Sequence, residues 1–378
     1  MSDTLLAHRT EAPASGRQRT FSWALIAVGI LVALVIPLFV STYWLQLAFT
    51  VCSLGVAMVG LTMLTGAGQL SMGAPFFMAV GSLTYVVLAG SPTDSGEVIG
   101  FGLPPVAAAI AGTVAGGIAG LIFSPIASRL SGIYLAMASL GLVILAEHIL
   151  NNMALLSGGF NGRRSPDFEL FGIVFGRTSD PLVIFGVPFG RQEWLWYLGI
   201  GLLLAAILFA RNIKRSRSGR ALQLVANSDL TASVAGVHVR AYKARIFFLS
   251  SLYGGLGGVL YTLAMGSIAP TSFNIDLALK TLAIIVIGGI GSIGGAVAGT
   301  VFVVCLPLVL QPLLGYVPFL ANDAATASYI SRYVYGLAVI LVLLFWPRGL
   351  AGIGAALASG FQSRRSARLA HEKEVEDA

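Results

Sequence analysis

Residues 277–310 read LALKTLAIIVIGGIGSIGGAVAGTVFVVCLPLVL, and this stretch determines how often the chain crosses a membrane. It is almost entirely apolar, but glycines interrupt it at Gly288, Gly289, Gly291, Gly294 and Gly295. A bilayer core of about 30 Å needs roughly 20 apolar residues for one helical crossing. The stretch therefore forms either one long tilted helix or two short passes joined at the glycines.

The composition of the whole chain agrees with a membrane location. Of 378 residues, 56% are hydrophobic and 10% are charged, whereas soluble domains carry about 25% charged residues. The chain has 46 glycines, which allow close contacts between membrane helices. This composition excludes a cytosolic enzyme, a DNA-binding module and a disordered scaffold. We therefore expect an all-α polytopic membrane protein.

Long apolar runs locate the other expected crossings. The run at 21–40 follows a basic start and is too long for the apolar part of a signal peptide, so we expect a retained first helix. The remaining runs lie at 45–64, 74–89, 104–123, 132–150, 194–210, 246–265 and 333–346.

The charges around these runs set the topology. Segment 211–245 carries eight Lys and Arg residues against a single acid, Asp229, which makes it cytoplasmic by the positive-inside rule. The basic tails at 1–20 and 351–378 are expected on the same side of the membrane. From its composition we expect the second tail to be disordered. The glycine-broken stretch must then start and finish outside, so it makes two passes. We predict about ten crossings within residues 21–350, some short or broken at glycines, and both termini in the cytoplasm.

The net charge of +7 reflects this topology and an attraction to anionic membrane lipid, not binding to nucleic acid. The longest outer segment, 151–193, mixes charged residues, phenylalanines, glycines and prolines. It is either a connector packed on the helix ends or a docking surface for an external partner. We expect it to form an ordered cap with little helix.

The chain lacks the motifs of nucleotide and metal chemistry. It has no GxxxxGK[ST] loop for nucleotide phosphates, no HExxH and no CxxC. Its four histidines are dispersed, so we expect no metal site, no catalytic residue and no cofactor in this chain. Glu147 and His148 form an interfacial pair near a helix end, and Lys280 follows Asp276 at the spacing of a helical ion pair. Because acids are nearly missing from the expected mid-membrane region, the energy for any transport comes from another chain.

The cytoplasmic segment contains a predicted amphipathic helix. From Arg220 to Ala235 there is no Pro or Gly, and Gly236 follows as a helix end. Leu222, Val225, Asp229 and Ala232 fall on one face at helical spacing. One interpretation is a surface helix lying on anionic lipid; the other is a helix that contacts a partner protein.

This segment resembles the loop of ABC importer permeases of the branched-chain (hydrophobic) amino acid type. The similarity rests on Ser-Gly-Arg-Ala at 218–221, the acid Asp229, Gly236 and Tyr-Lys at 242–243. Five further stretches resemble the family's motifs in the right order, and the first two indicate its M-type subunit. They are TGAGQLSMG at 65–73, SGIYLA at 131–136, SGGFNG at 157–162, GGIGSIGG at 288–295 and WPRGL at 346–350.

The resemblance implies a complex in the bacterial plasma (inner) membrane. The expected partners are a second, H-type permease, two cytoplasmic ATPase subunits that use ATP, and an extracytoplasmic substrate-binding protein. In the family the cytoplasmic helix inserts into a groove of the ATPase, and the matching residues here are Gly219, Arg220, Leu222, Val225, Asp229 and Gly236. Ala226, Asn227 and Ser233 depart from the family's pattern, in which charged residues are usual.

The glycine motifs are the candidate passage. Broken helices are tolerated inside a membrane where they are buried or line a cavity, and their free backbone groups can bind a zwitterion; the alternative is plain helix packing. The candidate passage or hinge residues are Gly66, Gly68, Gln69, Ser71, Gly73, Gly288, Gly289, Gly291, Ser292 and Gly295. The candidate outer-loop motif is Gly158, Gly159, Asn161 and Gly162.

Two functions remain open from the sequence. The first is a permease subunit of an ABC importer, which forms part of the pathway for branched-chain or related amino acids. The second is a stand-alone secondary transporter of a small polar solute. Relatives in the family are associated with Leu, Ile and Val, other amino acids, short amides or urea, and the sequence leaves the choice among these open.

Overall fold

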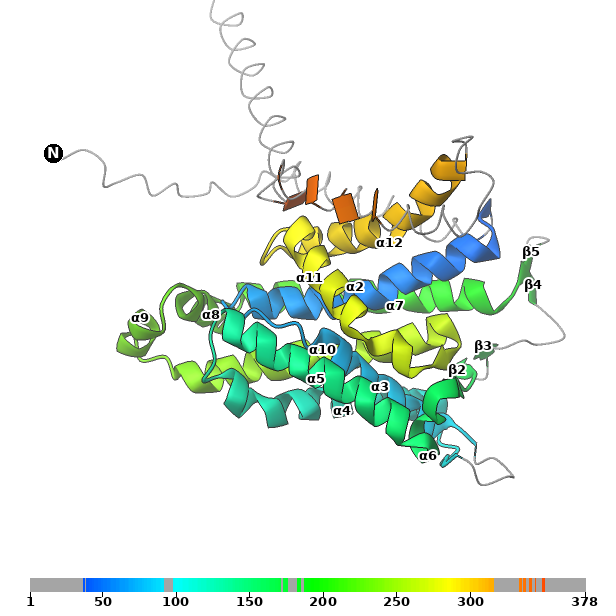
Figure 1. Ribbon diagram of the computed structural model, residues 1–378, viewed down its shortest axis with the longest axis horizontal. Coiled ribbons are helices and arrows are strands. Elements are labelled where there is room, and N and C mark those ends of the chain that lie inside the picture. The colour runs from blue at the N-terminus through cyan, green and yellow to red at the C-terminus, as the bar shows by residue number, and fades with distance from the viewer. Residues whose placement is uncertain are drawn as a thin grey trace, which may run out of the picture.

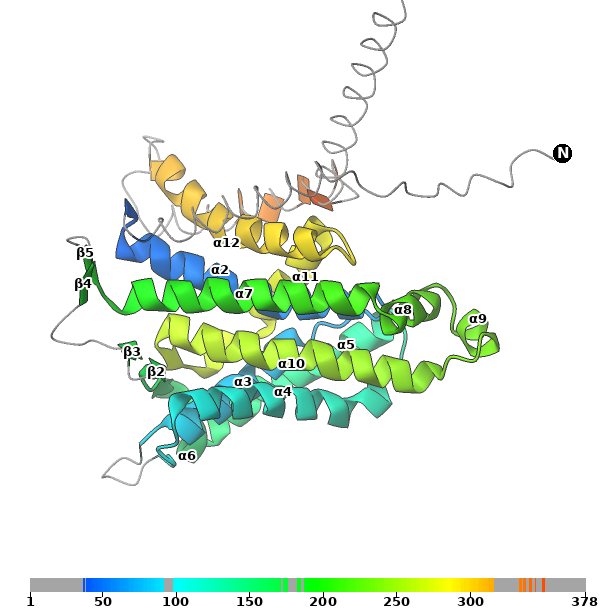
Figure 2. The same cartoon turned by 180° about the vertical axis from the view of Figure 1, so that it is seen from behind.

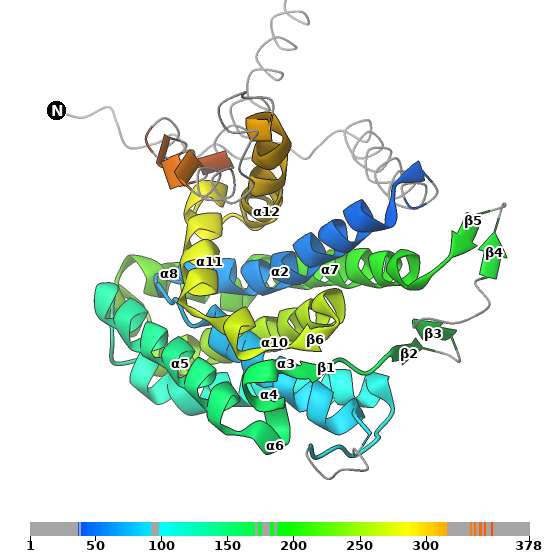
Figure 3. The same ribbon diagram turned by 45° about the vertical axis from the view of Figure 1, so that its right-hand side comes forward.

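The computed structural model describes residues 39–91, 98–170, 173–175, 182–184 and 187–315, together with residue 37 and isolated positions between 333 and 350. This part of the chain is an elongated helical bundle (Figure 1). Its apolar helices are α2 (Thr42–Thr65), α3 (Ala74–Ala89), α4 (Pro105–Ala127), α5 (Ile133–Asn152), α7 (Arg191–Arg215), α10 (Val239–Met265), α11 (Ile275–Gly288) and α12 (Ile293–Gly315). Most of these helices run lengthwise, whereas α11 crosses this direction (Figure 3).

Six segments of the described part are long and apolar enough to span a membrane. They are Thr42–Thr65, Pro105–Ala127, Ile133–Asn152, Arg191–Arg215, Val239–Met265 and Pro270–Gly288, and two shorter apolar helices cover Ala74–Ala89 and Ile293–Leu308. The prediction of a helical, polytopic membrane protein is confirmed at this level. The expected crossing at 21–40 lies almost wholly outside the described residues, as do the two tails, and the one at 333–346 is described only at isolated positions.

The glycine-broken stretch forms two helices. α11 ends at Gly288 and α12 begins at Ile293, with a tight turn between them. The two helices pack against each other, and α12 also packs on α2. One long tilted helix, the first of the two alternatives, is therefore excluded.

Helix α10 is the centre of the bundle. It packs against α2, α3 and α4, and small residues bring the backbones together. A Cβ built at Gly116 of α4 would lie 2.7 Å from the Cα of Gly255 on α10. Close approach of this kind stabilises membrane helix pairs, where lipid removes the hydrophobic driving force.

One end of the bundle carries short strands and turns. α6 (Ala154–Ser157) and the 3₁₀ turn η1 (Gly159–Asn161) precede β1 (Arg163–Arg164), which pairs antiparallel with β6 (Ser267–Ile268) before the turn η2 (Pro270–Phe273). Two small antiparallel pairs follow: β2 (Phe168–Leu170) with β3 (Ile173–Phe175), and β4 (Leu182–Ile184) with β5 (Val187–Phe189). Figure 3 shows these strands gathered at one end, called here the strand end. The described part of 151–193 is thus ordered with little helix before α7 begins, as expected.

The opposite end carries two short helices, α8 (Arg217–Asn227) and α9 (Asp229–Val234). Figure 2 shows α7 running into α8, and α9 leading into α10 at the same end. We call this the short-helix end. The ion pair expected between Asp276 and Lys280 is present in the first turns of α11, with 2.7 Å between Lys280 Nζ and Asp276 Oδ2.

Candidate functional site at the short-helix end

Helix α8 folds back directly on the end of α7. Ser216 caps α8, and its Oγ accepts a hydrogen bond from the Gly219 N–H at 3.4 Å. A Cβ built at Gly219 would lie 2.3 Å from the Lys214 carbonyl oxygen. Only a glycine allows this approach without movement of backbone, so the tight connection between α7 and α8 depends on Gly219.

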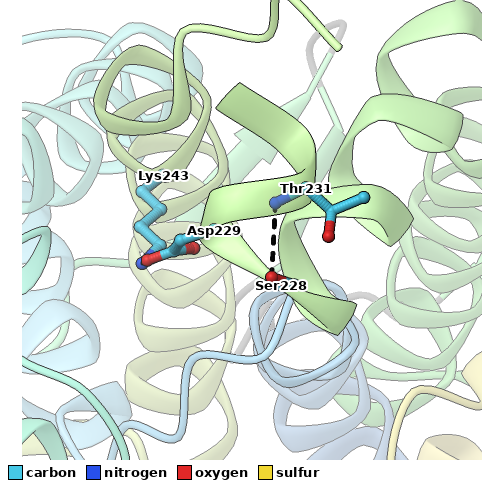
Figure 4. Close-up of polar contacts among 4 residues, drawn as sticks. All are labelled: Ser228, Asp229, Thr231 and Lys243. Carbon is cyan, nitrogen blue, oxygen red and sulfur yellow. Dashed lines mark hydrogen bonds and ion pairs between the residues drawn. The ribbon is translucent and has the colours of Figure 1, made fainter. Parts of the chain in front are cut away.

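The single helix expected from Arg220 to Ala235 is two helices. The chain becomes extended at Ser228, where α8 ends and α9 begins. The Ser228 Oγ accepts a hydrogen bond from the Thr231 N–H at 3.3 Å, which caps α9 (Figure 4). A serine that can satisfy a free N–H favours a helix start over a helix interior, and this explains the break. Gly236 follows α9 with a φ of +79° and turns the chain toward α10, as predicted.

The faces of these helices differ from the expected ones. Val225 is buried, and Leu222 is half-buried against the hydrophobic core of the bundle. These two side chains therefore face the chain's own helices in this structure, and their expected contact with an ATPase groove stays a prediction. The large apolar side chains that are exposed here are Leu224, Leu230 and Val234.

Two predicted charged residues of the segment, Arg220 and Asp229, have partners within the chain. Asp229 pairs with Lys243 near the start of α10, with 2.6 Å between Oδ2 and Nζ (Figure 4). Arg220 donates from Nη1 to the Arg215 carbonyl oxygen at 3.3 Å. Both contacts stabilise the fold of the segment itself, so the Asp229 charge is partly used inside the chain.

The first glycine segment, residues 66–73, connects α2 to α3 without regular structure. Gly68 has a φ of +79°, and a Cβ built there would lie 3.2 Å from the Cα of Ala226 on α8. The segment then turns into the bundle, where the Met72 N–H donates to the Ser139 Oγ of α5 at 2.8 Å. α8 is therefore in direct backbone contact with a segment that reaches inside the bundle.

Two polar side chains of this segment are buried. The Ser71 Oγ accepts from the Gly73 N–H at 3.2 Å. Gln69 is 3% exposed, and within the part of the chain that the structure describes neither its Nε2 nor its Oε1 has a hydrogen-bond partner. A buried amide without partners costs free energy comparable to a lost hydrogen bond for each group, so Gln69 is an unsatisfied polar group inside the bundle.

The second glycine segment is the turn between α11 and α12. Gly289 and Gly291 both have positive φ, and Ser292 caps α12 by accepting from the Gly295 N–H at 3.1 Å. Gly288 lies against Gly295 across the turn. The turn meets the first segment, since a Cβ built at Gly66 would lie 3.4 Å from the Cα of Gly291.

A cavity of about 370 Å³ lies where these parts meet, and we call this place the junction. The Lys214 Nζ donates to the Gly291 carbonyl oxygen at its edge. The cavity is lined by residues from α2, the first glycine segment, α7, α8, α10 and the α11–α12 turn: Met63, Thr65, Gly66, Ala67, Gly68, Ile213, Lys214, Gly219, Leu222, Gln223, Ala226, Ile246, Ile290 and Gly291. The structure thus brings together two groups of predicted residues that the sequence treats separately.

The outer-loop motif lies elsewhere. Gly158, Asn161 and Gly162 border a cavity of about 970 Å³ at the strand end, which Arg163 and Arg164 also line. Gly159 begins η1 beside it. This motif is therefore separate from the junction.

Lys214 and Ala226 are among the junction residues that the sequence does not identify as site residues. In the sequence Lys214 is one of eight basic residues, and Ala226 is a departure from the family pattern. Lys214 lies three residues after Arg211, close to the end of an apolar run. A lysine at such a position can lay its apolar stem along the helix bundle, and this signal could have identified it. Nothing in the sequence marks Ala226 as a contact of Gly68.

Comparison with known proteins identifies the family. The family described as branched-chain amino acid transport system, permease component, matches residues 43–344. The chain belongs to this family. As a permease component it is a transport protein and not an enzyme, and the six apolar helices together with the family indicate a protein of the inner membrane.

Named relatives indicate the subunit type. The permease is 26% identical over 349 residues to the high-affinity branched-chain amino acid transport system permease protein LivM of Escherichia coli, covering 88% of this chain and 75% of the relative. It is 21% identical to the probable branched-chain amino acid transport permease protein LivM of Methanocaldococcus jannaschii, covering 68% and 70%. It is 29% identical to the high-affinity branched-chain amino acid transport system permease protein LivH of E. coli, but over only 161 residues, which cover 43% of this chain and 47% of the relative. The longer match with LivM confirms the M-type resemblance.

Proposed function

We propose that this permease is the M-type subunit of an ABC importer and forms part of the pathway for branched-chain or related amino acids. ATP hydrolysis on separate subunits supplies the energy. The observation that carries this proposal is the junction, where helix α8 contacts the first glycine segment and Lys214, at the base of α8, contacts the second. A movement of α8 imposed from outside the bundle would reach segments that enter its interior.

The proposed topology has about ten crossings and two cytoplasmic ends. The six long apolar segments and two shorter helices of the described part account for eight crossings. The runs at 21–40 and 333–346 supply the other two. With the basic segment 211–245 in the cytoplasm, the short-helix end faces the cytoplasm and the strand end faces outward.

The ATPase contact is proposed at α8 and α9. Leu224, Leu230 and Val234 offer exposed apolar area to a groove of a partner. In this proposal Leu222 and Val225 anchor α8 on the permease, Gly219 and Gly236 turn the chain into and out of the segment, and Arg220 and Asp229 fix its shape. The residues of the segment therefore divide into those that hold it and those that meet the partner.

Gln69 is the proposed solute contact in the first glycine segment. Its amide offers two N–H donors and one carbonyl acceptor, and in the described part of the chain these groups are unpaired. An amino acid zwitterion carries the complementary carboxylate and ammonium. We propose that Gln69 meets the solute when the segment moves, with Ser71 and the turn at Gly291 and Ser292 beside the same passage.

The remaining partners are proposed from the family. A second, H-type permease completes the pathway, two ATPase subunits bind at the short-helix end, and an external binding protein delivers the solute at the strand end. The cavity of about 970 Å³ bordered by the outer-loop motif supports docking at that end.

A reconstitution experiment tests the proposal. The permease is purified with an H-type permease and ATPase subunits encoded by neighbouring reading frames, placed in proteoliposomes, and supplied with the external binding protein and labelled leucine. We expect uptake that requires ATP and the binding protein. Uptake by the permease alone, driven by an ion gradient, would contradict the importer and favour a secondary transporter.

Two matched variants test the ATPase contact. Leu230→Asp places a charge on an apolar residue of α9 that is 75% exposed, and Phe160→Asp does the same at the strand end, where Phe160 is 82% exposed. We expect Leu230→Asp to reduce retention of the ATPase subunits on the purified permease, and Phe160→Asp to leave retention unchanged. Equal retention in both variants would place the ATPase contact elsewhere.

A further inference from the structure

Lys214 occupies an unusual position among the basic residues of segment 211–245. It lies in the last turn of α7, it is half-buried, and its Nζ donates to the Gly291 carbonyl oxygen. Arg211, Arg215 and Arg217 nearby are exposed. The charge of Lys214 is therefore directed into the junction and not toward water.

The Gly291 carbonyl is a suitable acceptor for this ammonium. Gly291 lies in the turn between α11 and α12, with a φ of +78°, outside the hydrogen-bond ladder of either helix. A hydrogen bond from a charged donor is stronger than one between neutral groups. Lys214 thus binds a carbonyl of the turn from outside α11 and α12.

Lys214 also lies directly at the base of α8. Gly219 of α8 packs on the Lys214 carbonyl oxygen, so the start of α8 and the residue that holds the turn are in contact. Further along α8, Ala226 lies against Gly68. α8 is therefore linked to the first glycine segment by backbone contact and to the second through Lys214.

We propose that Lys214 is a positioning residue for coupling, which ties the α11–α12 turn to α8 so that displacement of α8 moves the second glycine segment. This inference rests on the proposed importer function. A partner changes the balance between two conformations only through contacts that differ between them. In this proposal the hydrogen bond from Lys214 to Gly291 is the contact that differs between the two conformations, and the adjoining cavity of about 370 Å³ gives the turn room to move.

Variants of Lys214 in the complete complex test this role. Lys214→Met removes the donor and keeps the apolar stem, Lys214→Gln keeps a neutral donor, and Lys214→Arg keeps the charge. Arg211→Met is the matched control, because it removes a charge from an exposed side chain in the same turn of α7. The readout is the amount of solute transported per ATP hydrolysed, which loss of protein alone does not change.

We expect Lys214→Met to assemble and to hydrolyse ATP in response to the binding protein, with transport per ATP reduced at least about fivefold, the lower range of allosteric coupling. Lys214→Arg and Arg211→Met should keep the ratio of the wild type. Unchanged transport per ATP in both Lys214→Met and Lys214→Gln would overturn the proposal. Failure of both to assemble, while Lys214→Arg and Arg211→Met assemble, would also overturn it by showing a purely structural role.

A second readout follows the junction itself. Cysteines placed at Gln223 and Ile290, which both line the cavity, report the distance between α8 and the turn by cross-linking, after Cys52 and Cys305 are replaced. We expect the cross-linking yield to change with the nucleotide state of the ATPases when Lys214 is present, and to lose this dependence in Lys214→Met. The same dependence in both would contradict the proposal. A wild-type complex without ATP-dependent uptake would instead contradict the importer function.

Discussion

Replacing Gly68 by alanine tests the contact between the first glycine segment and α8. Gly68 has a φ of +79°, which L residues rarely adopt, and an added Cβ would lie 3.2 Å from the Ala226 Cα and 3.3 Å from its carbonyl oxygen. Gly236 is a matched control, because it has the same φ of +79° and an added Cβ would meet nothing within 4 Å. The two substitutions share the backbone strain and differ in the contact.

The expected magnitudes follow from these two effects. A left-handed backbone costs an L residue about 1–2 kcal/mol, and this lowers the free energy of unfolding in both variants. The contact with α8 adds about 1–3 kcal/mol in Gly68→Ala, the usual cost of overpacking, because the neighbouring atoms are backbone and cannot rotate away. Gly68→Ala should therefore be the less stable variant by that difference.

Equilibrium unfolding of the purified permease in detergent micelles measures this difference, with uptake per assembled complex as a second measurement. We expect Gly68→Ala also to reduce uptake, since α8 must shift to accept the added methyl group. If the two variants unfold with free energies within about 0.5 kcal/mol of each other, the usual spread of neutral surface substitutions, the first glycine segment does not lie against α8 and the junction is wrongly described.

Three further predictions concern other parts of the chain. Single cysteines at Ser216 and Asn161, on opposite ends of the bundle, should react with a membrane-impermeant thiol reagent from inside and from outside respectively; labelling of both from the same side would contradict the topology. Asp229→Asn should lower the free energy of unfolding by about 0–1 kcal/mol, because the ion pair with Lys243 is partly exposed, and a loss well above that range in a denaturant titration would show that the pair is more deeply embedded. Gly291→Leu should abolish uptake per assembled complex, because a bulky residue with positive φ distorts the turn that Lys214 holds; full uptake with full assembly would exclude a role for the turn.

The sequence predicts the long helices closely because bilayer thickness imposes a length on each apolar run. The expected runs at 45–64, 74–89, 104–123 and 194–210 each fall largely within one helix of the structure, α2, α3, α4 and α7. Charge placement also predicts the break in 277–310, since a single pass would put the basic segment and the basic tail on opposite sides. Both predictions depend on properties summed over many residues, which tolerate errors at single positions.

The division between α8 and α9 depends on one residue, and the periodicity of the segment hides it. Leu222, Val225, Asp229 and Ala232 continue one helical face across Ser228, so the pattern alone favours a single helix. The sequence Asn227-Ser228-Asp229 carries the contrary signal, because a serine followed by an acid in the first turn is typical of a helix start. Here the capping signal prevails over the periodicity. The Thr231 N–H donates to the Ser228 Oγ, a hydrogen bond that a continuous helix would not form.

The direction of the apolar face of α8 could not be predicted for a different reason. An amphipathic helix shows which of its residues avoid water, but its own bundle and a partner protein offer them equivalent apolar surroundings. Here the bundle takes Leu222 and Val225, and the break at Ser228 leaves Leu230 and Val234 of α9 exposed on a second, differently directed helix. A segment that buries one apolar face on the permease and presents another outward can transmit a displacement from a partner to the interior. A helix with a single apolar face would have to give up one contact to make the other.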